Sequence, residues 1–187
     1  AKLGLLNKYD INKLNLIFFY QKNNLIIGDT VLLLNDQNFK SKAISIKKVK
    51  DKFIINGDIA HDKLNLNNKN LNLFIKPYFP NLNVEKINFS SKSIFSFQAN
   101  KRINIKNFEI NSEMIIDEFA FLNNYNLNEF FPNIKNKFLF SNNKLFIKYK
   151  DKNLSINGSG NVLSQKNNDN LIYTINKKDK NIDFKFT

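Results

Sequence analysis

Residues 138–186 read FLFSNNKLFIKYKDKNLSINGSGNVLSQKNNDNLIYTINKKDKNIDFKF and consist of short segments in which apolar and polar residues alternate. Apolar residues recur in them at every second position, as in Leu145, Ile147 and Tyr149. Lys148 lies between two of these residues, and Lys150 follows the last one. A period of two places such side chains on one face of a pleated strand. Polar turns of about three to seven residues separate the segments, which is too short for parallel crossovers. The stretch therefore predicts an antiparallel meander with one apolar and one polar face.

The rest of the chain carries similar short segments between polar turns. Residues 25–34 are apolar at both parities, which indicates burial on both faces or a contact with another molecule. A helix and a strand fit residues 114–122 equally well, and one short helical turn is expected near residues 126–131, before Pro132. About fourteen strands are expected in the whole chain, including those of residues 138–186. The strands expected before residue 138 are residues 14–20, 25–34, 39–47, 53–59, 64–66, 71–75, 84–89, 94–99, 103–110 and 114–122.

These elements predict an all-β fold: an elongated, twisted antiparallel meander that forms a curved β-groove, with at most one short helical turn. Small closed barrels use about eight strands, and many strands in one open sheet tend to curl or split. A lipocalin-like closed barrel and a two-sheet adhesin-type sandwich are the alternatives. We interpret residues 1–187 as one segment, an excerpt of a longer protein, in which residues 1–13 form a weakly structured lead-in.

Composition limits the partners. The formal net charge is +13, but lysine supplies it almost alone, because Arg102 is the sole arginine. Recognition of phosphates and bases relies on the bidentate geometry of arginine, so we expect no nucleic-acid partner and regard an anionic membrane surface as a better one. The chain has no cysteine, and therefore no disulfide and no thiolate metal site. No run of about 18 apolar residues is present that would span a bilayer.

Three stretches carry a resemblance to a known family. Residues 101–112 (KRINIKNFEINS), residues 154–162 (LSINGSGNV) and residues 53–59 (FIINGDI) resemble the AsmA-like family, most closely its YhdP and TamB branch of Gram-negative envelope proteins. The resemblance covers most of residues 40–187 and consists of periodicities. It implies a periplasmic protein that is anchored in the inner membrane. It also implies a hydrophobic groove that conducts phospholipid acyl chains toward the outer membrane.

The apolar stripe of the meander is the candidate binding surface. Such a stripe is ordinarily a protein core, but the strand count exceeds what a small sandwich needs, and no amphipathic helices are evident to cover the sheet. The stripe thus lines either a lipid groove or the closed core of a structural or adhesive module. The residues expected to line the groove are Phe95, Phe97, Ile103, Ile105, Leu145, Ile147, Tyr149, Leu154, Ile156, Val162, Tyr173, Ile175, Phe184 and Phe186.

Other candidate sites have simpler interpretations. His61 beside Asp62 lacks further ligands for a metal and is expected in a loop. Ser159 lies between glycines that do not form a nucleophile elbow, and Gly158 and Gly160 are expected to mark a bulge or a bend. An acidic concentration is expected to be a solvated face that interacts with neighbouring lysines; it consists of Glu109, Glu113, Asp117, Glu118 and Glu129. We therefore expect no enzyme, no metal site and no cofactor.

Overall fold

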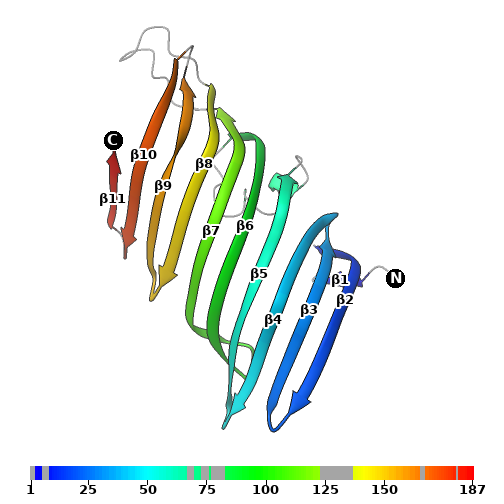
Figure 1. Ribbon diagram of the computed structural model, residues 1–187. Helices are drawn as coiled ribbons and strands as arrows, with labels where there is room; N and C mark the ends of the chain where they lie inside the picture. The colour runs from blue at the N-terminus through cyan, green and yellow to red at the C-terminus, as the bar shows by residue number, and fades with distance from the viewer. Residues whose placement is uncertain are drawn as a thin grey trace.

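The computed structural model describes residues 3–5, 9–66, 70–72, 76, 83–122, 137–164, 167–179 and 181–187. These residues form one sheet of eleven antiparallel strands whose order in space is their order along the chain (Figure 1). The predicted all-β, open, curved meander is therefore confirmed. The strands are β1 (Leu3–Leu5), β2 (Tyr9–Gln21), β3 (Asn24–Leu34), β4 (Gln37–Val49), β5 (Lys52–Leu66), β6 (Asn83–Asn100), β7 (Ile105–Leu122), β8 (Lys137–Lys150), β9 (Asn153–Ser164), β10 (Asn167–Lys178) and β11 (Asn181–Phe186).

The strands within the described residues are fewer and longer than the fourteen short ones that the sequence suggested. Strands β5, β6 and β7 each join two segments that were predicted separately, because the polar residues between them lie in the strand and not in turns. The ambiguous residues 114–122 belong to β7. Residues 9–13, expected to be weakly structured, belong to β2.

The secondary structure between β5 and β6 also differs from the prediction. Residues 71–75 were expected to form a strand, but residues 70–72 are helical, and residues 73–75 lie outside the described residues. The predicted helical turn at residues 126–131 lies outside the described residues. Within the described part of the chain, no helical segment has the length and apolar character that crossing a bilayer requires.

Tight turns connect several neighbouring strands. Lys22 and Asn23, Asn35 and Asp36, and Asp151 and Lys152 each occupy a two-residue turn with φ between 45° and 65° at both positions. Positive φ at both positions is the geometry of a type I′ turn, whose twist matches that of the flanking strands. The expectation that polar turns separate the strands is confirmed at these three places.

Irregularities inside the strands keep the apolar residues on one face. Lys63 and Asn142 have φ of 47° and 52°, and the register of the neighbouring strands shifts by one residue at each of them. A bulge inserts one residue and bends the strand, so the side-chain alternation restarts with the opposite parity beyond it. In β8, Phe138 and Phe140 consequently lie on the same face as Leu145.

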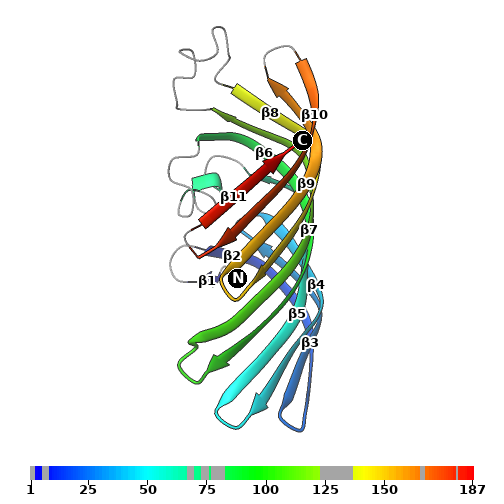
Figure 2. The ribbon, with the colours of Figure 1, turned by 90° about the vertical axis from the view of Figure 1, so that its left-hand side faces the viewer.

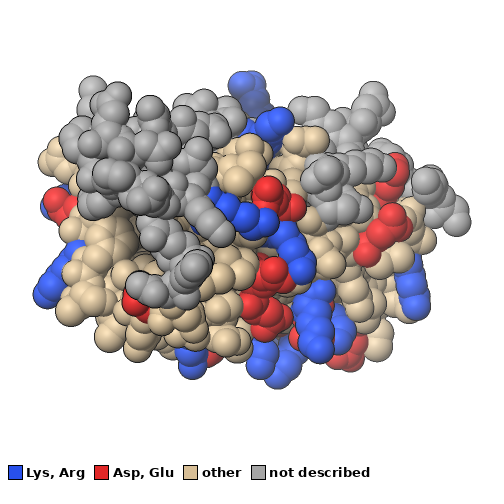
Figure 3. Space-filling model, turned by 90° about the horizontal axis from the view of Figure 1, so that it is seen from above, with Lys and Arg blue, Asp and Glu red and all other residues tan. Residues whose placement is uncertain are grey.

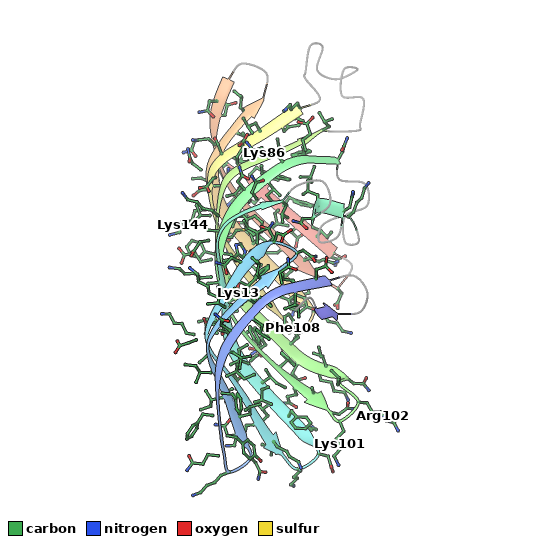
Figure 4. All side chains as sticks on the ribbon, turned by 90° about the vertical axis from the view of Figure 1, so that its right-hand side faces the viewer. Lys13, Lys86, Lys101, Arg102, Phe108 and Lys144 are labelled. Atoms are coloured by element: carbon green, nitrogen blue, oxygen red, sulfur yellow. The ribbon has the colours of Figure 1, made fainter. Side chains whose placement is uncertain are left out.

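The sheet is curved, and its two faces differ in chemistry. We call the concave side, which the helical residues 70–72 cover in part, the inner face, and the convex side the outer face (Figure 2). Leu71 packs there with Leu64 and Leu66 in the small buried core cluster, against Phe39, Val84, Ile87 and Phe89. Figure 4 shows Phe108 on the concave side and Lys144 on the convex side.

The described residues form neither a closed barrel nor a pair of packed sheets, since β1 and β11 stand at the two ends of a single sheet. The exposed area agrees with a single layer. A compact monomer of this mass exposes about 9,300 Å², whereas this chain of 21.9 kDa exposes 13577 Å². Much of the apolar surface of the described residues therefore lacks a described partner of the kind that a two-layer core provides.

Candidate functional site: the inner face of the sheet

The inner face is continuous across the sheet. Residues directly opposite each other on antiparallel strands point to the same side, so the register identifies the face of each side chain. One row crosses four neighbouring strands through Ile147, Ile156, Ile175 and Phe184, each paired with the next. A second row joins Phe95 through Ile110 and Tyr149 to Leu154. The same register places thirteen of the fourteen residues expected to line the groove on the inner face: Phe95, Phe97, Ile105, Leu145, Ile147, Tyr149, Leu154, Ile156, Val162, Tyr173, Ile175, Phe184 and Phe186.

Ile103 is the exception, and its expected position was wrong. It lies in the connection between β6 and β7, has φ of 60° and is 78% exposed. Its backbone N–H donates to the carbonyl of Asn100, which closes a turn. Ile103 is thus part of the turn, and the strand begins only at Ile105.

Aromatic rings line the inner face in two groups. In the lower group, which lies toward the turn between β6 and β7, the centroids of Phe97 and Phe108 are 6.3 Å apart, and those of Phe108 and Tyr149 are 5.9 Å apart. In the upper group, Phe121 stacks on Phe138 with centroids 5.4 Å apart. Such offset contacts add to the burial of the rings. Both groups extend the apolar surface along the length of the strands.

Several of these rings were not predicted from the sequence. Phe108, Phe119, Phe121, Phe138 and Phe140 were not among the expected lining residues, although the register puts them on the inner face. The alternation of Phe138 and Phe140 was visible in the sequence. These two residues differ in parity from Leu145, so a regular strand would place them on the opposite face. The bulge at Asn142 places them on the same face as Leu145.

The glycines of β9 provide room for neighbouring side chains. The β9–β10 register runs without a shift through Gly158 and Gly160. The β8–β9 register shifts by one residue at Gly160, where Asn142 and Asn143 of β8 lie opposite this glycine, so the expected bulge is present at Gly160 with its extra residue on β8. A Cβ at Gly160 would lie 2.3 Å from Cγ of Asn143, whose side chain covers it. Asn143 is 1% exposed, and its Nδ2 donates to the carbonyls of Ser141 and Asn161. This amide anchors the bulged part of β8 to β9.

A band of polar side chains interrupts the apolar inner face near its centre. His61, expected in a loop, lies within β5, is 8% exposed and has Nε2 2.8 Å from the hydroxyl of Ser91. Its ring stands edge-on to Phe89, with centroids 4.6 Å apart. Burial lowers the pKa of His61 below its ordinary value, and the carboxylate of Asp62 partly opposes this shift. The imidazole is therefore neutral at neutral pH.

The other members of this band are hydroxyls. Thr30 of β3 lies directly opposite Ser41 of β4, and Ser93 of β6 lies opposite Ser112 of β7. The hydroxyls of Ser93 and Ser112 are 2.7 Å apart and satisfy each other. In contrast, Thr30 Oγ1, Ser41 Oγ and His61 Nδ1 are buried and have no hydrogen-bond partner in the structure. Buried polar atoms without partners are costly and uncommon.

The outer face carries ion pairs beside exposed apolar side chains, of which Ile94 and Phe146 are 68% and 51% exposed. Glu109 pairs with Lys150, Glu113 with Lys144 and Glu118 with Lys86, which confirms the interpretation of these carboxylates as a solvated face. Glu129 lies outside the described residues. Seen from above, basic and acidic side chains are interspersed along the described surface (Figure 3). Exposed pairs of this kind contribute little to stability but keep the surface hydrated.

The outer face also holds an open depression of about 1120 Å³, lined in part by Lys92, Glu113, Phe146 and Lys148. Asp62, next to His61 in sequence, is exposed and pairs with Lys40 at 2.8 Å, and this hydrogen bond lowers the pKa of the carboxyl. His61 and Asp62 thus point to different environments. Among the described residues, no three metal-ligating side chains come together.

Comparisons of the chain with family models, with curated proteins and with solved structures found no match.

Proposed function

We propose that the chain binds the acyl chains of phospholipids on its inner face and conducts them between the inner and outer membranes of a cell envelope, without catalysing a reaction. The observation that carries this proposal is the apolar inner face of a single open sheet, which is unbroken in the row from Ile147 to Phe184 across β8 to β11. The described residues contain no second sheet that would cover the apolar inner face. Acyl chains are extended and apolar, so their binding would shield this face from water.

The distribution of polarity supports the same proposal. The row from Ile147 to Phe184 presents only aliphatic and aromatic side chains on the inner face, while lysine–glutamate pairs occupy the outer face. A half-buried apolar surface that runs across many strands suits a mobile chain better than it suits a compact ligand. The alternative, a structural or adhesive module with a closed core, needs a second apolar layer, and no observation on the described residues favours it.

The resemblance to the AsmA-like family supports the cellular setting that we propose. In that setting the chain lies in the periplasm as part of a protein anchored in the inner membrane, and phospholipid is its ligand. We propose no nucleic-acid partner, since the described carboxylates of the outer face pair with its lysines and intersperse negative charge among the positive.

Native mass spectrometry of the gently purified protein tests this function. Co-purified phospholipid is the expected result, and its removal should lower the melting temperature because a ligand that binds only the folded state stabilises it. A folded monomer that is free of lipid and whose melting temperature does not respond to added phospholipid would favour the closed structural module instead.

A further inference from the structure

The polar band on the inner face has a chemistry that a plain hydrocarbon groove does not need. Ser41 and His61 are 7% and 8% exposed, yet Ser41 Oγ and His61 Nδ1 have no hydrogen-bond partner, and neither has Thr30 Oγ1. All three side chains lie on the inner face, on the adjacent strands β3, β4 and β5. Unpartnered buried donors and acceptors that share one face form a ready site for a polar group.

The geometry brings these groups close together. Thr30 and Ser41 are directly opposite each other across β3 and β4. Lys40 pairs with Ala60, which puts Ser41 and His61 on diagonal positions of β4 and β5. Diagonal neighbours on one face of a sheet are about 7–8 Å apart between their Cα atoms. One small polar group of a ligand can thus reach more than one of these side chains.

The groups in the band are neutral. Thr30 and Ser41 carry hydroxyls, and burial keeps the imidazole of His61 uncharged at neutral pH. The carboxylate of Asp62, next to His61 in sequence, is exposed and paired with Lys40. A phosphate would need cations or several N–H donors, whereas a carbonyl oxygen accepts hydrogen bonds from hydroxyls and from a neutral imidazole N–H. The band therefore favours a neutral acceptor.

The band also has a defined place along the groove. Above it lies the core cluster, in contact with the His61 ring through Phe39 and Phe89. Below it the inner face is aliphatic and aromatic, beginning with Ile44, Gly57 and Phe95. An acyl chain can lie along the lower surface while the group at its head reaches the band.

We propose that Thr30, Ser41 and His61 form a subsite for the ester carbonyls of a diacyl glycerolipid. This inference rests on the proposed function and adds to it the chemical group that the groove recognises. The subsite would make the groove selective for lipids whose chains are joined to glycerol by esters, as opposed to ethers.

The test compares two lipids of equal chain length and the same headgroup, a dioleoyl phosphatidylcholine and its diether analogue, which lacks the carbonyls. Equimolar vesicles of the two are offered to the protein, and native mass spectrometry gives the ratio of bound species. One net hydrogen bond corresponds to roughly a fivefold preference, so the wild type should favour the diester by about fivefold or more.

The informative variant is Thr30→Val with Ser41→Ala, which removes both hydroxyls with little change in shape. Its preference should fall to about one, while its melting temperature without lipid should not decrease, because no protein hydrogen bond is lost. Ser93→Ala with Ser112→Ala is the control, since these hydroxyls satisfy each other on the same face. The control should keep the preference.

Several results would overturn the subsite: equal binding of both lipids by the wild type, a preference that survives in the Thr30 and Ser41 variant, or an equal loss in the control. These are distinct from failure of the proposed function, in which the wild type would bind neither lipid.

Discussion

Gly158 of β9 lies directly opposite Tyr173 of β10, and the tyrosine ring occupies the space above the glycine. A Cβ built on Gly158 would be 2.3 Å from Cζ of this ring, far closer than van der Waals contact allows. Burial of the ring raises the pKa of the Tyr173 hydroxyl. The absence of a side chain on β9 thus allows an aromatic ring to lie flat on the inner face.

Replacement of this glycine should destabilise the sheet. Gly158→Ala forces the Tyr173 ring to move and should lower the free energy of unfolding by about 1–3 kcal/mol, the usual cost of overpacking. Gly28→Ala is a matched control, because a Cβ there would lie 3.6 Å from its nearest neighbour, the carbonyl oxygen of Lys42. The control should be neutral or stabilising by up to about 1 kcal/mol. Urea denaturation measures both, and equal losses would contradict the role of the ring.

His61 should make stability depend on pH. Its pKa is lowered in the folded state, so the unfolded chain takes up a proton first as the pH falls below about 6.5. Stability is therefore full above that pH and decreases as the pH falls through the folded-state pKa. Because His61 is the sole histidine, its titration can be assigned without ambiguity.

The variant His61→Phe with Ser91→Ala checks this assignment. It keeps an aromatic ring against Phe39 and Phe89 and removes both partners of the His61–Ser91 hydrogen bond. Thermal melts between pH 7.5 and pH 5, a range chosen to bracket the ordinary histidine pKa of about 6.5, should show a smaller pH dependence than in the wild type. An unchanged slope would mean that another group dominates the titration.

The inner face should tolerate a charge better than a closed core does. Ile156→Asp puts a carboxylate in the row between Ile147 and Ile175. In a dry core, an unpaired charge costs several kcal/mol and would unfold a marginally stable domain. On an open face the carboxylate stays partly hydrated, so the sheet should survive while phospholipid binding is lost.

The neighbouring residue provides the control for this substitution. Asn157→Asp adds the same charge one position along β9, on the outer face, where Asn157 is exposed and accepts a hydrogen bond from Thr174. It should keep both the fold and the lipid. The readouts are a thermal melt and lipid extraction. An unfolded Ile156→Asp variant, or one that carries as much lipid as the wild type, would count against the groove.

The alternation of residues such as Leu145, Ile147 and Tyr149 was enough to predict the all-β meander, because a period of two has one structural meaning in a strand. It was not enough to count the strands. Lys63 and Asn142 adopt left-handed φ inside strands, and from sequence alone such residues are indistinguishable from those in turns. The two segments on either side of Lys63 were consequently counted as separate strands. The residues before Asn142 were not assigned to the face that Leu145 occupies.

The polar band could not be predicted for a related reason. His61 and Ser41 are far apart in sequence and come together only through the pairing of β4 with β5, which includes a register shift between Lys40 and Ile44. The alternation does not encode that shift. Ile103 was misplaced because its parity matches that of Ile105, although Ile103 belongs to the turn that precedes the strand.

Photo-crosslinking from defined positions tests the lipid groove most directly. Benzoylphenylalanine replaces Phe108 or Phe184 on the inner face, or Phe146 on the outer face, and the protein is irradiated with phospholipid vesicles that carry a labelled acyl chain. Phe184 and Phe146 are similarly exposed, at 59% and 51%, so accessibility does not separate them. The groove predicts labelled adducts at positions 108 and 184 and none at position 146. Equal labelling of both faces, or labelling at position 146 alone, would contradict it.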